Sequence, residues 1–140
     1  MRQIIDPASM RKARFIRSGL LFALALGTTL VQSGNWNVPT ESKDLKNPVA
    51  IDEKTTAQAK SLYALHCVDC HGAQGAGDGA KSRVDYDLRT IVDPLTDGEL
   101  YWKITHGVGK MPSFAGTLDD RGRWLMVNYL RHLRAESDRK

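Results

Sequence analysis

The sequence has only two cysteines, no internal repeat and no low-complexity tract in its 140 residues. It also has no alternating or strongly β-branched run, which argues against a β-sheet fold and favours a helical one. No second pair of Cys or His residues stands at zinc-ligand spacing, so a structural zinc site is disfavoured. The length suffices for one modest domain and argues against a second.

The excess of positive charge lies near the N-terminus. A formal net charge of +4 and a pI near 9.2 would suggest an anionic partner such as nucleic acid if the charge were spread over the folded part. Beyond Ser33, however, fifteen Lys and Arg balance fifteen Asp and Glu. The main part of the chain is therefore near neutral, and we expect no nucleic-acid partner.

The N-terminal residues resemble an export signal. Residues 19–31, GLLFALALGTTLV, form a short apolar run behind a basic flank, and small residues favour cleavage after Ser33. Spanning a bilayer takes about 20 apolar residues, so this run is marginal as a permanent anchor. We predict that residues 1–33 are a signal peptide or, alternatively, an N-terminal anchor. The protein is then periplasmic or exported, and tethered to the membrane if the segment is uncleaved.

The polar stretch over residues 34–52 is typical of a linker or a strap. Three helices are predicted after it. The first helix covers about residues 55–65, where apolar side chains recur at helical spacing. The second begins at a capping box formed by Thr96 and Glu99 and ends at Gly107. The third starts from a second capping signal at residues 117–120. Its long apolar stripe consists of Trp124, Leu125, Met126, Val127, Tyr129, Leu130 and Leu133.

These patterns predict an all-α domain over residues 53–136, with three main helices and long loops. Three short helices enclose little core on their own, so the long loops need a further packing partner. A buried cofactor would supply it.

The two cysteines stand in the string CVDCH, as Cys67 and Cys70 followed by His71. This spacing lets both sulfurs add to the two vinyl groups of one haem and places the histidine beneath the iron. A lone disulfide, a thioredoxin-like redox pair and half of a zinc site are the alternatives. A thioredoxin-like pair should lie between a strand and a helix, whereas here a predicted helix precedes the motif and a glycine-rich stretch follows it.

A second axial ligand to the iron should be a thioether or an imidazole from beyond the motif. Met111 is favoured, because it lies in the string GVGKMPSF, whose glycines permit close backbone approach and whose proline restricts the chain. His106, at the end of the second predicted helix, is the main rival. Met126 lies mid-helix in an apolar stripe, where methionine usually fills the core, and His132 lies on a charged face near the chain end.

Four glycines in HGAQGAGDGAKS, which follows the second cysteine, suggest phosphate binding at first sight. The spacing is not that of a dinucleotide-binding loop and no strand precedes it, so a loop along one edge of the haem is the simpler interpretation. Three nearby side chains could donate hydrogen bonds to haem propionates, although each is equally typical of ordinary surface or core: Tyr86, Arg89 and Trp102.

From residue 47 onward the chain resembles class I c-type cytochromes, most closely the haem domains of cbb3-type oxidases. The segments SLYALHCVDCHGAQGAGDGA and LTDGELYWKITHGVGKMPSF carry the resemblance. It implies covalent haem c on Cys67 and Cys70, with His71 and Met111 as iron ligands. It also implies packing of the first helix, through Ala59 and Tyr63, against the last.

The resemblance further implies single-electron transfer rather than catalysis. With His71 and Met111 on the iron, no coordination position is open to a small-molecule substrate, and the partners are redox proteins. We expect a mobile periplasmic carrier or, alternatively, a haem subunit fixed in a membrane respiratory or dehydrogenase complex. A ligand-binding or peroxidatic haem protein is a third possibility and would require Met111 to leave the iron.

Overall fold

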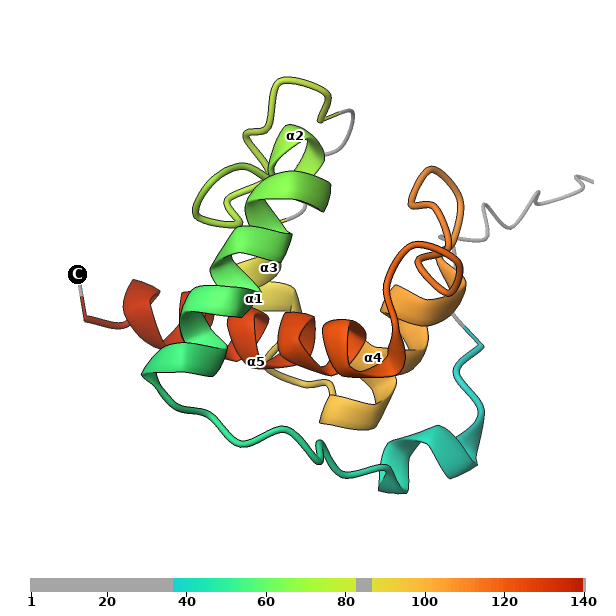
Figure 1. Ribbon diagram of the computed structural model, residues 1–140. Helices are drawn as coiled ribbons and strands as arrows, with labels where there is room; N and C mark the ends of the chain where they lie inside the picture. Colours follow the sequence, from blue (N-terminus) through green and yellow to red (C-terminus); the bar gives the residue numbers. More distant parts are fainter. Residues whose placement is uncertain (1–36, 83–86, 140) are drawn as a thin grey trace, which may run out of the picture. The chain divides into compact units, whose positions relative to one another are not determined.

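The computed structural model describes residues 37–82 and 87–139, and within them the fold is all-α, as predicted (Figure 1). The expected export segment, residues 1–33, and Tyr86 lie outside the described residues. No strand occurs in the described part, only an isolated bridge between Val108 and Met111. The elements, in order, are η1 Thr40–Asp44, α1 Glu53–His66, α2 Val68–His71, α3 Leu88–Ile91, α4 Asp97–His106 and α5 Asp120–Ser137.

The core forms where α1, α3 and α4 pack on α5. Ala59 and Tyr63 of α1 are almost fully buried, and the Tyr63 ring lies 4.9 Å from that of Tyr129 on α5. This is the contact of first and last helix that the family resemblance implied. Every residue of the stripe predicted for the last helix is buried. Together these apolar side chains give the small domain most of its hydrophobic stabilisation.

The predicted helix ends are correct for α4 and need correction for the other two main helices. α4 begins with the Thr96 and Glu99 capping box and ends at Gly107, as predicted. α1 begins earlier than predicted, because the Asp52 carboxylate accepts a hydrogen bond from the Thr55 amide. α5 is capped by Asp119 rather than by the expected Thr117, whose amide instead closes a turn in the preceding loop.

The short elements η1, α2 and α3 were not predicted. Each has only four or five residues, which is too few to show a helical period. α3 is started by the Asp87 carboxylate, which accepts a hydrogen bond from the Arg89 amide. None of the described helices has both the length and the apolar content needed to cross a membrane.

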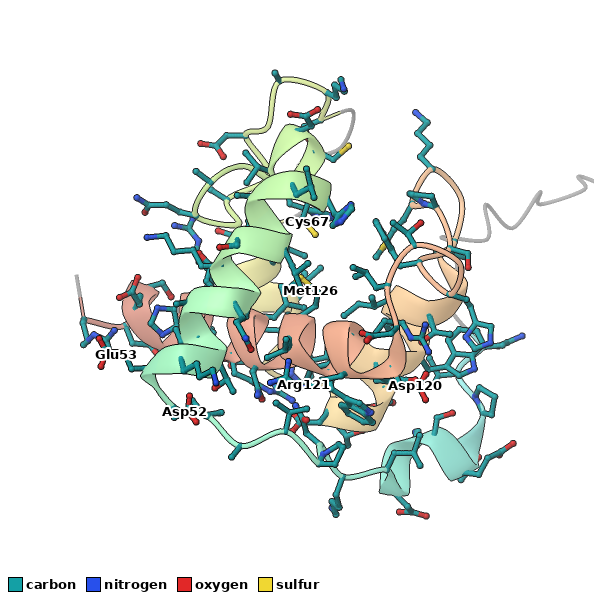
Figure 2. The ribbon with its side chains drawn as sticks, in the orientation of Figure 1. Asp52, Glu53, Cys67, Asp120, Arg121 and Met126 are labelled. Carbon is teal, nitrogen blue, oxygen red and sulfur yellow. The ribbon has the colours of Figure 1, made fainter. Side chains whose placement is uncertain are left out.

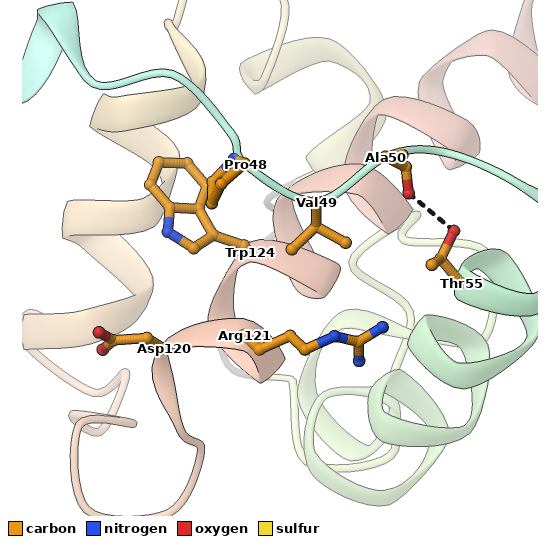
Figure 3. Close-up of a pocket in the computed structure, with 7 residues that line it drawn as sticks. All are labelled: Pro48, Val49, Ala50, Thr55, Asp120, Arg121 and Trp124. Atoms are coloured by element: carbon orange, nitrogen blue, oxygen red, sulfur yellow. Dashed lines mark hydrogen bonds between the residues drawn. The ribbon is translucent and has the colours of Figure 1, made fainter.

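Residues 37–52, which we call the strap, pack against the domain. Two asparagines fasten the strap to α5: Asn47 donates to the Asn128 side chain at 2.7 Å and to the Trp124 carbonyl at 3.1 Å. Asn128 donates in return to the Val49 carbonyl at 3.0 Å. The next turn of the chain is held to α1, because the Thr55 hydroxyl donates to the Ala50 carbonyl at 2.9 Å (Figure 3).

Gly98 in the first turn of α4 lets the strap approach closely. A Cβ at this position would stand 1.8 Å from the Ser42 carbonyl oxygen. Alanine in place of Gly98 would favour the helix by about 1 kcal/mol, but the overlap should cost roughly 1–3 kcal/mol or displace the strap. In Gly98→Ala we therefore expect faster hydrogen exchange and protease cleavage within the strap.

Gly116→Ala is the matched control, because a Cβ at Gly116 would meet nothing within 4 Å. We expect that control to change the free energy of unfolding by no more than about 0.5 kcal/mol and to leave the strap protected. Equal rates of hydrogen exchange in the strap of Gly98→Ala and Gly116→Ala would mean that the strap does not depend on its close approach to Gly98.

Candidate functional site

The CVDCH string forms the corner between α1 and α2. Cys67 ends α1, where its amide donates to the Tyr63 carbonyl, and its own carbonyl accepts from the amides of Cys70 and His71 at 3.2 and 2.9 Å. One helical turn thus carries both thiols and the imidazole. Cys67 is half-buried against the core that contains Met126, whereas Cys70 is exposed, and both thiols are free (Figure 2).

Burial sets the protonation of this corner. Burial and, to a smaller extent, the neighbouring Cys70 together raise the pKa of the Cys67 thiol to about 12. Burial lowers the pKa of His71, since the interior disfavours the imidazolium. At neutral pH the fold therefore presents a neutral thiol and a neutral imidazole, and only the neutral imidazole has a lone pair free for a metal ion.

The backbone after the histidine is held by Tyr63. Its hydroxyl donates to the Gly72 carbonyl at 2.9 Å, a buried hydrogen bond that joins the middle of α1 to the residue following His71. The His71 carbonyl accepts from the Gly77 amide, also at 2.9 Å. Burial raises the pKa of Tyr63, so its hydroxyl stays protonated and remains a donor. The sequence indicated the Tyr63 ring as core but gave no sign of the role of its hydroxyl.

The glycine-rich stretch folds back on the motif. A Cβ at Gly79 would lie within 2.6 Å of the carbonyl oxygens of Val68 and Asp69, and one at Gly72 would overlap the Asp78 carboxylate. Lys81 closes the loop, since its ammonium group lies 2.7 Å from the Asp69 carboxylate. These glycines therefore serve close packing of the loop on the CVDCH turn.

In Tyr63→Phe we expect the free energy of unfolding of the haem-loaded protein to fall by about 1–3 kcal/mol, because the buried Gly72 carbonyl would lose its partner. Tyr129→Phe is the control: it belongs to the same ring pair, and the described residues offer its hydroxyl no hydrogen-bond partner. Denaturant titration should show a change of at most about 0.5 kcal/mol for this control. Equal losses of unfolding free energy in Tyr63→Phe and Tyr129→Phe would mean that the hydrogen bond to Gly72 does not stabilise the fold.

Met111 lies in the connection between α4 and α5, residues 107–119, which we call the methionine loop. The Met111 amide donates to the Val108 carbonyl at 2.9 Å, and Gly107 and Gly109 adopt positive φ angles of 63° and 58°. A Cβ at Gly107 would lie 2.4 Å from the Met111 carbonyl oxygen, so this tight turn requires glycine. Met111 itself is half-buried and packs on the core cluster.

The methionine loop and the CVDCH corner lie on the same side of α5 (Figure 1). Phe114 of the loop meets His66, the residue before the first cysteine, edge to face with ring centroids 6.2 Å apart. His66 is therefore half-buried against the loop, rather than simply solvent-facing. Cys67 and Met111 both pack on the core cluster, and the Phe114–His66 contact brings the methionine loop against the end of α1.

The rival ligands are engaged elsewhere. His106 is exposed; its ring stacks on Trp102 at 4.2 Å and its Nδ1 lies 2.9 Å from the Trp102 carbonyl oxygen. Met126 is buried in the core, 3% exposed, as expected for a mid-helix methionine. His132 stacks on Tyr129 and lies 3.6 Å from Glu136.

The two described residues considered as propionate donors also have protein partners. The Arg89 guanidinium is paired with the Asp87 carboxylate at 2.6 and 2.8 Å, and Trp102 stacks on His106. A shallow hollow in the described surface lies away from the CVDCH corner, between the strap and the start of α5 (Figure 3). It is lined by Pro48, Val49, Ala50, Thr55, Asp120, Arg121 and Trp124.

The donor set suits haem c. Two thiols and an imidazole on one helical turn are the groups needed for two thioether bonds and one axial bond, and the methionine loop carries a thioether of the soft kind that haem iron accepts. A helical fold whose first and last helices pack beside such a turn defines the class of c-type cytochrome domains.

A family model described as cytochrome c oxidase, cbb3-type, subunit III matches residues 54–130, more than half of the chain. The chain belongs to this family. Its matched part is a cytochrome c domain, the kind of domain that carries covalent haem c and transfers electrons.

A curated relative is the cytochrome bc1 complex cytochrome c subunit of Corynebacterium diphtheriae, 30% identical over 90 residues, or 64% of this chain and 31% of that protein. A chain of the Kuenenia stuttgartiensis reducing HAO-like protein complex Kustc0457/Kustc0458 is 29% identical with a TM-score of 0.54, over 61% of this chain and 46% of that one. This chain thus spans less than half the length of either. Cytochrome c6 from the diatom Phaeodactylum tricornutum is 20% identical with a TM-score of 0.46, over 58% of this chain and 95% of that one.

Proposed function

We propose that this protein transfers single electrons through a haem c bound by thioether bonds to Cys67 and Cys70, with His71 and Met111 as axial ligands. The observation that carries the proposal is the CVDCH turn at the end of α1, with the methionine loop packed on the same core. When bound, the haem supplies an iron that cycles between the ferric and ferrous states.

The protein residues attach, orient and shield that group. Each cysteine adds across one vinyl group: the sulfur bonds to one vinyl carbon and the thiol hydrogen goes to the other. His71 enters as the neutral imidazole that its burial favours. The hydrogen bond from Tyr63 to the Gly72 carbonyl holds the turn on which His71 stands.

Met111 completes the site and determines its chemistry. A thioether ligand stabilises the ferrous state relative to a second imidazole, and so raises the reduction potential. With His71 and Met111 as its ligands, the iron would have no position open to a small-molecule substrate. The electron must therefore cross to another redox protein docked on the surface.

Residues 1–33 are proposed to direct export, which places the domain in the periplasm or an equivalent compartment. Haem is joined to such motifs outside the cytoplasmic membrane in bacteria, so an exported chain is consistent with the CVDCH motif. If residues 1–33 are a cleaved signal peptide, the mature chain begins near Gly34.

A fixed haem subunit of a membrane complex is the second candidate. It is favoured by the relative from Corynebacterium diphtheriae, whose name places it in a cytochrome bc1 complex. Mass spectrometry of the mature chain separates the two candidates. A chain starting near Gly34 in the soluble periplasmic fraction supports the mobile carrier, whereas an uncleaved chain in the membrane fraction supports the fixed subunit.

The test of the proposed function is the absorption spectrum of protein from a host with haem c maturation, recorded oxidised, reduced and after acid-acetone extraction. We expect the haem to stay with the protein through extraction. The oxidised form should show the weak far-red band of a sulfur–iron bond, and added carbon monoxide should leave the ferrous spectrum unchanged. Complete loss of haem on extraction would overturn covalent attachment. A ready response to carbon monoxide would favour the ligand-binding or peroxidatic alternative.

A further inference from the structure

Arg123 is a charged residue in the first turn of α5, at the start of the buried face of this helix. It is 7% exposed and follows Gly122 in a run of buried residues that continues to Leu130. Buried arginines are rare unless paired, since removing a guanidinium from water is costly. The apolar period of this helix alone would not predict a cation at this position.

The Arg123 guanidinium donates two of its four hydrogen bonds to the methionine loop. One terminal nitrogen, Nη1, donates to the Leu118 carbonyl at 2.6 Å and to the Ala115 carbonyl at 3.4 Å. The other, Nη2, donates to the Tyr101 hydroxyl at 2.9 Å and to the Asp120 carboxylate. A single side chain of α5 therefore joins the far end of the loop to α4 and to the start of its own helix.

The surroundings of Arg123 keep its side chain in place. Its guanidinium lies 5.3 Å from the centre of the Tyr101 ring, and that ring stacks on Trp124 at 4.1 Å. Tyr101 also donates to the Asp120 carboxylate at 3.0 Å. Only Nε of Arg123 is buried without a partner among the described residues, so the fold tolerates one unsatisfied donor here.

The near end of the methionine loop is fixed by separate contacts. The Ser113 hydroxyl donates to the Thr105 carbonyl at 2.6 Å, and the Phe114 amide donates to the Ile104 carbonyl at 3.2 Å. Between Phe114 and α5, the loop has turns closed on the Phe114 carbonyl, the buried Leu118 side chain and the Asp119 cap of α5. Arg123 adds hydrogen bonds from an α5 side chain to the loop carbonyls of Ala115 and Leu118.

We propose that Arg123 is a positioning residue for Met111. By holding the carbonyls of Ala115 and Leu118, it fixes the methionine loop over the CVDCH corner and so determines how firmly the Met111 sulfur holds the iron. The inference rests on the proposed function, because it requires Met111 to be the ligand. The Asp120 carboxylate is exposed, so the buried guanidinium depends on its hydrogen bonds to loop and α4 groups, and the benefit of such a buried charge is a defined conformation.

The test uses the haem-loaded full chain with Arg123→Lys, which keeps the charge but removes the planar fork. We expect the far-red band of the ferric protein to weaken. Added imidazole should displace Met111 at a concentration roughly tenfold lower than in the unchanged protein, the effect of losing one or two ordinary hydrogen bonds.

Arg131→Lys is the matched control. Arg131 also lies on α5 and also binds two loop carbonyls, those of Val92 and Leu95 at 2.8 and 2.5 Å, and it pairs with Asp97. These contacts hold the α3–α4 connection instead of the methionine loop. Both variants should lower the stability of the fold, but Arg131→Lys should leave the far-red band and the imidazole affinity unchanged.

Equal imidazole affinity in the Arg123→Lys and Arg131→Lys proteins would overturn the inference. If Arg123→Lys does not fold, Tyr101→Phe removes one partner of the guanidinium, and we expect it to shift the imidazole affinity in the same direction, with faster hydrogen exchange over residues 113–118. A Tyr101→Phe protein with unchanged imidazole affinity and unchanged hydrogen exchange over residues 113–118 would also overturn the inference. Absence of the far-red band from the unchanged protein would instead refute Met111 as the ligand, and with it both proposals.

Discussion

Replacement of Met111 by alanine is expected to abolish the far-red band of the oxidised protein and to lower its reduction potential. The band arises from the sulfur–iron bond, and alanine cannot supply one. Axial ligands set haem potentials over a range of roughly 0.8 V, and loss of a thioether removes the ligand that favours the ferrous state. The opened position should also bind imidazole or carbon monoxide, which the unchanged protein should resist.

Two variants serve as controls for Met111→Ala. Met126→Leu conserves volume in the core, so it should cost less than about 1.5 kcal/mol and leave spectrum and potential unchanged. His106→Ala removes the rival ligand and, because that ring is exposed and stacked on Trp102, should also leave the spectrum unchanged. If Met111→Ala behaved like the unchanged protein while His106→Ala altered the potential, His106 would be the ligand.

The Cys67→Ala, Cys70→Ala double variant is expected to release all its haem on acid-acetone extraction. Without either thioether bond, only axial bonds and packing hold the group, and both fail when the chain unfolds. The core of the domain is small, and a cofactor bound to the native state stabilises it by mass action, so thermal unfolding should become broader and occur at lower temperature.

The single variants give the internal comparison for the double variant. Each should retain haem through the remaining sulfur. Cys67→Ala should be the less stable of the two, since Cys67 packs on the core whereas Cys70 is exposed. Haem that survived extraction from the double variant would show that other residues make the covalent attachment.

The parts of the fold that the sequence predicted are governed by neighbours close in the chain. The α4 boundaries follow from a capping box and a terminal glycine, whose hydrogen bonds span three or four residues. The apolar stripe of α5 follows from helical periodicity. The cap predicted for α5 was wrong: Asp119 caps the helix, and Thr117 lies in a turn closed on Phe114.

The candidate site divides in the same way. The CVDCH motif needs no tertiary information, since the two sulfurs and the imidazole lie on one turn whose spacing matches one cofactor. Met111 could be favoured from its local glycines and proline, but the packing of its loop beside His66 could not be predicted. The α1–α5 contact was anticipated from family resemblance rather than from periodicity.

By itself, then, the sequence determined the three main helices and the CVDCH motif and favoured Met111 as the ligand, because each depends on residues within a few positions of one another. Only the tertiary structure decided how distant polar groups pair. The Asn47–Asn128 contact joins residues 81 positions apart, and the Tyr101–Arg123 contact crosses from α4 to α5. Hydrogen bonds of this kind leave no periodic or compositional signal, since a buried Arg or Asn becomes favourable only after the fold has brought its partners within reach.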